Sequence, residues 1–276
     1  MSKIPIISSR KNFFKRGVIS NKDKARMVNL ADPRPTNCKI ISISDISNLS
    51  KDKEIYILMH GYNNSFTELA DAYLKISNLL QSSGVNYGQL IGYVWPGGYM
   101  GMLSYLAAKR SAKQLSERMA GFIDEIGGSA SKVNIVAHSL GCFLALLAMK
   151  KMLSNVSNIY LLAPAVSNKA LLPNQIFSSG LKRADLIYVF KSSDDMVLKW
   201  GFRAAEFGHK ALGFTGSDPF QQVWHRTVEV DCSNQTPVIS HSEYLHRSEI
   251  FDFIANNPVV ENIPAQLILR SKLLRK

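Results

Sequence analysis

Residues 133–143 read VNIVAHSLGCF and predict a short apolar strand, a tight turn and an apolar helix that runs on to about Met149. The turn AHSLG is close to G-x-S-x-G, the pattern of a nucleophile elbow, with Ala137 in the first glycine position. Because the backbone of such a turn is strained, the residues two before and two after the serine must be small, as Ala137 and Gly141 are. Ser139 is therefore predicted at the end of a strand and the start of a helix, where free N–H groups favour negative charge.

This short motif has two interpretations. Ser139 is either a nucleophile or an ordinary turn residue that caps the helix after it. The choice depends on whether the rest of the chain supplies a base, an acid and an oxyanion site in a suitable order.

Length and composition are typical of one globular α/β domain. The chain has 276 residues, of which 46% are hydrophobic and 20% charged. The longest apolar run, residues 140–149, is too short to cross a bilayer, and the N-terminus lacks the apolar core of a signal peptide. Three cysteines without metal or redox spacing (Cys38, Cys142 and Cys232) predict reduced thiols in a cytoplasmic protein. No metal site and no cofactor are expected.

The net charge of +12 is concentrated at the two ends of the chain. Residues 1–37 hold nine Lys or Arg and two Asp or Glu, and residues 262–276 hold four Lys or Arg and no acid. The remainder, residues 38–261, is nearly neutral, which argues against a basic face on the domain and makes nucleic acid an improbable partner. The ends are candidates for peripheral contact with an anionic membrane, or they are plain solvated segments.

Apolar runs and helical spacing predict the order of elements. Strands are expected at 55–59, 90–95, 133–138, 158–162, 186–190 and 223–230, with a weak first strand at 39–43, and helices at 66–80, 104–126 and 244–254. Strands alternating with helices predict a mostly parallel sheet covered on both faces. No segment of the sequence is long enough to form a large cap domain. The insertions at 97–103, 164–183 and 201–220 are the candidates for a lid. We expect a loosely ordered basic arm at 1–37, one domain at 38–261 and a basic tail at 262–276.

Suggestive residues follow four of the predicted strands. Ser139 follows one, Asp194 and Asp195 follow another, His241 lies after the last, and His60-Gly61-Tyr62 follows the strand at 55–59. Ligands of an open parallel sheet bind at these carboxyl ends. A histidine can take the serine proton, and a carboxylate can hold the imidazole in one tautomer.

The predicted oxyanion site uses two backbone N–H groups, those of Leu140 and Tyr62. Asp194 and Asp195 are both possible acids. His241 has the placement of the base, whereas His246 falls inside the closing helix and is expected to be structural. His60 and His138 flank the site and are expected to order loops.

The sequence resembles the α/β-hydrolase superfamily and, more narrowly, a bacterial family of lipase-like hydrolases. The features that carry the resemblance extend from about 53 to 255. They are His60-Gly61-Tyr62-Asn63-Asn64-Ser65-Phe66, Trp95-Pro96-Gly97, Tyr105 with Ser111, Ala137-His138-Ser139-Leu140-Gly141, Ser192-Ser193-Asp194-Asp195 before Leu198, Val230-Asp231-Cys232-Ser233 and His241-Ser242-Glu243-Tyr244.

The resemblance implies a serine ester hydrolase without metal or cofactor. It favours Asp195 over Asp194 as the acid, since Asp195 stands two residues before Val197, the spacing usual in the family. We therefore expect a carboxylesterase or lipase with the triad Ser139, Asp195 and His241, acting on small-molecule or lipid esters; a thioesterase is a close variant. The alternative is a non-catalytic scaffold of the same fold that docks a partner through its basic ends.

Overall fold

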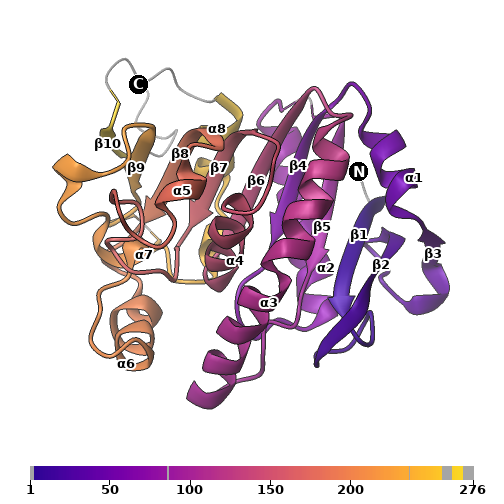
Figure 1. Ribbon diagram of the computed structural model, residues 1–276, viewed down its shortest axis with the longest axis horizontal. Coiled ribbons are helices and arrows are strands. Elements are labelled where there is room, and N and C mark those ends of the chain that lie inside the picture. The colour runs from indigo at the N-terminus through magenta and orange to yellow at the C-terminus, as the bar shows by residue number, and fades with distance from the viewer. Residues whose placement is uncertain (1–2, 86, 236, 257–262, 270–276) are drawn as a thin grey trace.

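The apolar runs predicted as strands form the middle of one ten-stranded sheet (Figure 1). The computed structural model describes residues 3–85, 87–235, 237–256 and 263–269. The strand order is β10-β9-β8-β7-β6-β4-β5-β1-β2-β3, and the pairs from β10 to β1 are parallel, whereas β1, β2 and β3 pair antiparallel. The strands are β1 (Lys3–Arg10), β2 (Ile19–Asn29), β3 (Cys38–Ile41), β4 (Glu54–Met59), β5 (Gln89–Val94), β6 (Lys132–His138), β7 (Val156–Leu162), β8 (Ala184–Lys191), β9 (Thr227–Asp231) and β10 (Ala265–Ile268).

Helices cover both faces of the sheet, which confirms the predicted fold class. One face carries α1, α3, α4 and α5, and the other carries α2 and α8 (Figure 1). The α-helices are α1 (Ile43–Ser50), α2 (Phe66–Ser82), α3 (Met102–Gly127), α4 (Leu140–Met149), α5 (Ser178–Leu181), α6 (Arg203–Ala205), α7 (Leu212–Thr215) and α8 (Ser248–Asn256). Shorter turns of other helix types are η1 (Pro35–Asn37), η2 (Val197–Phe202), η3 (Phe220–Gln222) and η4 (Glu243–Leu245).

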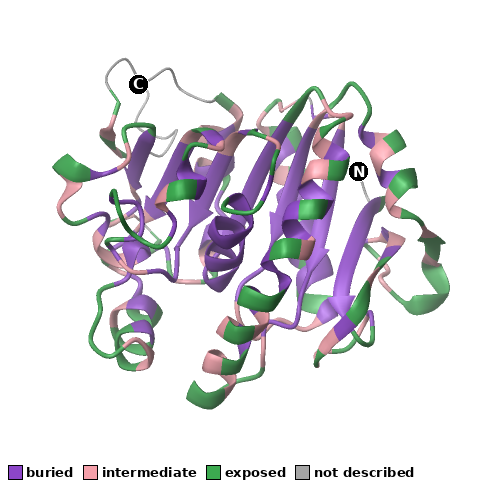
Figure 2. Ribbon diagram, viewed as in Figure 1, coloured by how far each residue is buried: buried purple, intermediate pink, exposed green. Residues whose placement is uncertain are grey.

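Two apolar cores lie on the two sides of the sheet, because successive side chains of a strand point to opposite faces. In β4, Ile57 belongs to the core under α3 and α4, whereas Tyr56 and Leu58 belong to the core under α2. All residues of α4 are buried, as expected for a helix that is apolar on every side. Figure 2 shows this helix and the middle strands of the sheet as largely buried, with the exposed residues of α3 on its outer surface.

The prediction of a loosely ordered basic arm at 1–37 is wrong. Strand β1 lies inside the sheet between β5 and β2, and Ile4, Ile6 and Ile7 are fully buried. The parallel ladder with β5 begins at Ile6, after the proline at position 5. Sequence reasoning missed the strand because its apolar run is short, contains a proline and leads into polar residues. The domain therefore includes the N-terminal segment, and a 38–261 fragment would lack β1, β2 and β10.

Three element boundaries also differ from the prediction. The strand expected at 39–43 is the short β3 at the edge of the sheet, and the strand expected at 223–230 begins only at Thr227, after the turn η3. The helix expected at 244–254 divides into η4 and α8. Between them Arg247 is buried, and its side chain donates hydrogen bonds to the carbonyl of Pro237 (2.9 Å) and to Glu249.

The structure describes only residues 263–269 of the predicted C-terminal tail. Ala265–Ile268 forms β10, which pairs with β9, and Leu269 after it is buried. The cations at 270, 272, 275 and 276 lie outside the described residues. Within the described ranges, no helix has the length and apolar character needed to span a membrane.

Candidate active site

The turn between β6 and α4 has the geometry of a nucleophile elbow. Ser139 has φ of 53° and ψ of −123°, a backbone conformation in which a residue other than glycine is strained. A Cβ atom on Gly141 would lie 2.4 Å from the carbonyl oxygen of His60, so the neighbouring loop approaches too closely for a side chain there. This confirms the need for a small residue after the serine. The turn is held in part by the N–H of Ser139, which donates to the carbonyl of Leu162 (2.9 Å).

Ser139, His241 and Asp195 form a continuous chain of hydrogen bonds. The hydroxyl of Ser139 lies 2.8 Å from Nε2 of His241, and Nδ1 of His241 lies 2.7 Å from Oδ2 of Asp195. Since the carboxylate accepts the Nδ1–H, the neutral imidazole presents a free lone pair at Nε2 to the serine hydroxyl. The structure therefore brings together the three residues predicted as the triad.

The two adjacent aspartates have different surroundings. Asp195 is fully buried, and its Oδ1 accepts the N–H of Leu198 (3.0 Å) while Oδ2 faces His241. Asp194 is partly exposed and accepts the N–H of Asn234 at 2.8 Å. The carboxylate that orients the imidazole is thus the one that the family spacing favours, and its neighbour fastens a loop.

His138 fixes the segment that carries the base. Its Nε2–H donates to the backbone carbonyl of His241 (2.7 Å), and the two rings are 5.0 Å apart. Burial, together with the nearby His241, lowers the pKa of His138 to about 3, so its ring stays neutral and keeps this bond. His246, the other histidine of this region, is exposed.

The loop after β4 packs directly against the elbow. A Cβ on Gly61 would lie 2.8 Å from Cβ of Ser139, which brings the chain next to Tyr62 close to the serine. His60, just before it, accepts the N–H of Trp95 at Nε2 (3.0 Å), and its carbonyl accepts the indole N–H of the same tryptophan (2.9 Å). Leu140 begins α4, where the first N–H groups have no partner inside the helix. Of the two predicted oxyanion residues, Leu140 follows Ser139 directly in the chain, and Tyr62 follows the glycine that packs against Ser139.

Two arginines of the N-terminal segment support this region, and sequence reasoning missed both: Arg10 ends β1, and Arg16 lies in the loop between β1 and β2. Arg10 is 1% exposed and donates to the carbonyls of Trp95 and Asn64, each at 2.9 Å. Arg16 donates to the side chain of Asn63 (2.7 Å) and pairs with Glu68. Burial lowers the pKa of Arg10 to about 10, and burial together with Arg10 lowers the pKa of His60 well below its usual value. The sequence signal that could have identified Arg10 is its position shortly after the apolar run at residues 4–7.

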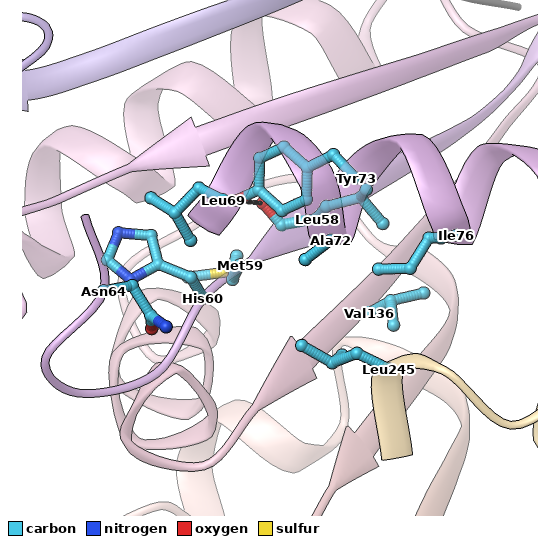
Figure 3. Close-up of a pocket in the computed structure, with 10 residues that line it drawn as sticks. All are labelled: Leu58, Met59, His60, Asn64, Leu69, Ala72, Tyr73, Ile76, Val136 and Leu245. Carbon is cyan, nitrogen blue, oxygen red and sulfur yellow. Dashed lines mark hydrogen bonds between the residues drawn. The ribbon is translucent and has the colours of Figure 1, made fainter. Parts of the chain in front are cut away.

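Two cavities lie near the elbow and the loop after β4. One, of about 190 Å³, lies between α3, α4, the segment after β7 and η2; Phe143, Phe177 and Phe202 line its apolar part. One residue of its wall, Ala165, donates its N–H to the carbonyl of Ser139 (3.2 Å), so the wall contacts the backbone of the elbow. The other has about 20 Å³, enough for one water molecule, and Figure 3 shows His60 and Asn64 at its end under α2.

Fold and site together define an α/β-hydrolase, and the comparison with protein families agrees. Residues 42–257, more than three quarters of the chain, match the family described as "Alpha/beta hydrolase of unknown function (DUF900)". The chain belongs to this family, which supports hydrolysis as the general class of activity. No curated protein gives a significant sequence match.

Solved structures offer more distant similarities. An esterase from Pyrobaculum calidifontis is 14% identical with a TM-score of 0.45, and the similarity covers 86% of this chain and 81% of that one. A variant of SOBER1 from Arabidopsis thaliana is 17% identical with a TM-score of 0.44, covering 74% of this chain and 96% of that one.

Proposed function

We propose that this protein is a serine ester hydrolase that works through an acyl-enzyme. The observation that carries the proposal is the hydrogen-bonded chain from Ser139 through His241 to the buried Asp195, at a strained turn on the catalytic edge of the sheet. A carboxylic ester is the leading substrate class, and a thioester follows the same chemistry.

In the proposed first step, Oγ of Ser139 attacks the ester carbonyl carbon while Nε2 of His241 takes the hydroxyl proton. The charge that develops on the carbonyl oxygen is stabilised by the N–H groups of Leu140 and Tyr62. The tetrahedral intermediate then loses the alcohol, which leaves with the proton from His241. Water, deprotonated by the same imidazole, attacks the acyl carbon; the bond from that carbon to Oγ then breaks, the imidazolium returns its proton to Oγ, and the acid and the free enzyme result.

The apolar cavity whose wall contacts the elbow through Ala165 supports an acyl group as its occupant. Three phenylalanines line it, and it is smaller than the ligand sites of about 300–1,000 Å³ that bind drug-sized molecules. A series of p-nitrophenyl esters of increasing chain length tests the proposal: we expect turnover that favours short acyl groups and declines once the chain outgrows the cavity. Absence of turnover with every ester and thioester tested would contradict it.

Replacing Asp195 with asparagine tests which of the two adjacent aspartates orients His241. We expect kcat to fall on the order of 10⁴-fold, because the amide no longer holds His241 in the tautomer that accepts the serine proton. Asp194→Asn is the matched control, since its carboxylate binds the N–H of Asn234, and it should change kcat little. Steady-state kinetics on one soluble ester measure both; a larger loss at Asp194 would contradict the assignment.

Replacing Arg10 with methionine tests the role of the N-terminal strand in catalysis. We expect kcat to fall about 10- to 100-fold with KM little changed, because the loop that carries Tyr62 loses a charge-assisted hydrogen bond at Asn64 and the neighbouring loop loses another at Trp95. Arg34→Met is the control, since Arg34 is an exposed arginine of the same segment that pairs with Asp32. An unchanged kcat in folded Arg10→Met protein would show that Arg10 only stabilises the fold.

A further inference from the structure

Two segments at the catalytic edge of the sheet expose large apolar side chains. Residues 99–103 comprise the end of the loop after β5 and the first residues of α3, and residues 196–207 extend from the triad aspartate through η2 and α6. Each of the following side chains is more than half exposed, and we call them the apolar rim: Tyr99, Met100, Leu103, Val197, Trp200 and Phe207. A cluster of this kind on a monomer marks an interaction surface.

The two segments are neighbours and flank the site. Lys109 of α3 forms an ion pair with Glu206, just after α6, at 2.6 Å. The hydroxyl of Tyr62 donates to the carbonyl of Gly101 (2.8 Å), and the N–H of Lys199 donates to the carbonyl of Asp195 (3.0 Å). Figure 1 shows the first turns of α3 and helix α6 both extending at the lower end of the molecule, and Figure 2 shows exposed residues on both.

Positive charge surrounds the apolar rim. Residues 99–113 and 196–210 together hold six Lys or Arg and a single acid, Glu206, which is paired with Lys109. Four of these cations are exposed: Arg110, Lys113, Arg203 and Lys210. The near-neutral total for residues 38–261 therefore includes two segments that are locally basic.

Phe207 gives a separate indication that the rim binds something apolar. It is 94% exposed and has φ of 52°, a left-handed conformation that is unfavourable for a bulky side chain. The turn is closed by the N–H of Gly208, which donates to the carbonyl of Arg203 (2.8 Å). The chain thus presents an aromatic ring to solvent at a position where glycine or asparagine is usual.

We infer that the apolar rim docks this protein on a bilayer that contains anionic lipids, with the catalytic edge of the sheet toward the headgroups. Exposed aromatic and aliphatic side chains amid lysine and arginine match the chemistry of such an interface, where apolar groups insert and cations meet anionic headgroups. The inference does not rest on the basic ends, because residues 3–10 and 19–29 are strands of the sheet rather than a free arm. That the lipids are also substrates rests on the proposed ester hydrolysis.

Vesicle co-sedimentation tests the inference with full-length protein carrying Ser139→Ala, so that lipids stay intact. The rim variant adds Met100→Ser, Trp200→Ser and Phe207→Ser. The control variant adds Val18→Ser, Ile40→Ser and Leu153→Ser, three exposed apolar residues outside the two segments. The vesicles are phosphatidylcholine alone, or phosphatidylcholine with phosphatidylserine, at low and high salt.

We expect the parent protein to bind the anionic vesicles, more weakly at high salt, and the rim variant to lose roughly tenfold or more in affinity while the control does not. No binding by the parent, equal binding to neutral vesicles, or equal loss in both variants would overturn the inference; a protein or nucleic-acid partner would then have to explain the rim. In the background with Ser139 intact, both triple variants should hydrolyse a soluble short-chain ester normally. If no protein hydrolyses any ester, the proposed function fails while the binding result still stands.

Discussion

Replacing Ser139 with alanine lowers kcat by about 10⁶-fold, the loss expected when the nucleophile of a hydrogen-bonded triad is removed. The fold should stay intact, because the hydroxyl bonds to the His241 ring and the rest of the turn is held by backbone contacts and by the close approach of Gly61 and Gly141. Hydrolysis of a soluble p-nitrophenyl ester measures the loss, and near-ultraviolet circular dichroism checks the fold.

Ser193→Ala is the matched control for this change, since Ser193 is an exposed serine two residues before Asp195. It should retain the activity of the unchanged protein. If folded Ser139→Ala protein kept a substantial part of its turnover, the serine-nucleophile mechanism would be wrong as a whole, whatever the fate of the other site residues.

Replacing His241 with alanine has an effect of the same size, about 10⁶-fold in kcat, because the serine loses the base that takes its proton and the leaving alcohol loses its acid. His246→Ala is the control, since His246 is exposed and lies at the end of η4. Kinetics on the same ester compare the two variants.

A double variant adds a check on the chemistry. If Ser139 and His241 act as one unit, removing both should be no worse than removing either, because each single change already abolishes the step they share. Losses that multiply instead, or a larger loss at His246 than at His241, would show that the base has been assigned to the wrong residue.

The central part of the fold could be predicted because its signals are local. Strands β4 to β8 are apolar runs with polar ends, and the elbow requires small residues that are visible in AHSLG. The order of the chemically active strand ends along the chain then predicts the triad. The choice between Asp194 and Asp195 came from the family spacing, since the two residues are alike in the sequence.

The N-terminal strands could not be predicted because their stability depends on distant partners. Ser9 is buried, and its hydroxyl contacts Tyr93 (2.7 Å) and Asp23 (2.6 Å), while Arg10 is satisfied by backbone carbonyls of residues 95 and 64. A buried polar group is tolerated when it is hydrogen-bonded. None of these pairings leaves a periodic signal in the sequence.

The positive charge at the catalytic edge of the sheet could not be predicted from the sequence for a related reason. Segments 99–113 and 196–210 are separated by more than 80 residues in the chain, and their cations join one surface only after folding. A total over residues 38–261 mixes them with acidic positions elsewhere. Charge becomes informative about a partner once the structure assigns it to a face.

Labelling with a fluorophosphonate probe, followed by peptide mapping, tests the serine-hydrolase assignment most directly. The probe reacts with an activated serine whatever the natural ester is, so it does not depend on finding the substrate. We predict one modified residue, Ser139, in the full-length protein, with labelling lost in Ser139→Ala and strongly reduced in His241→Ala. A folded protein that takes up no label, or takes it up at another serine, would contradict the assignment and leave the fold as a non-catalytic module.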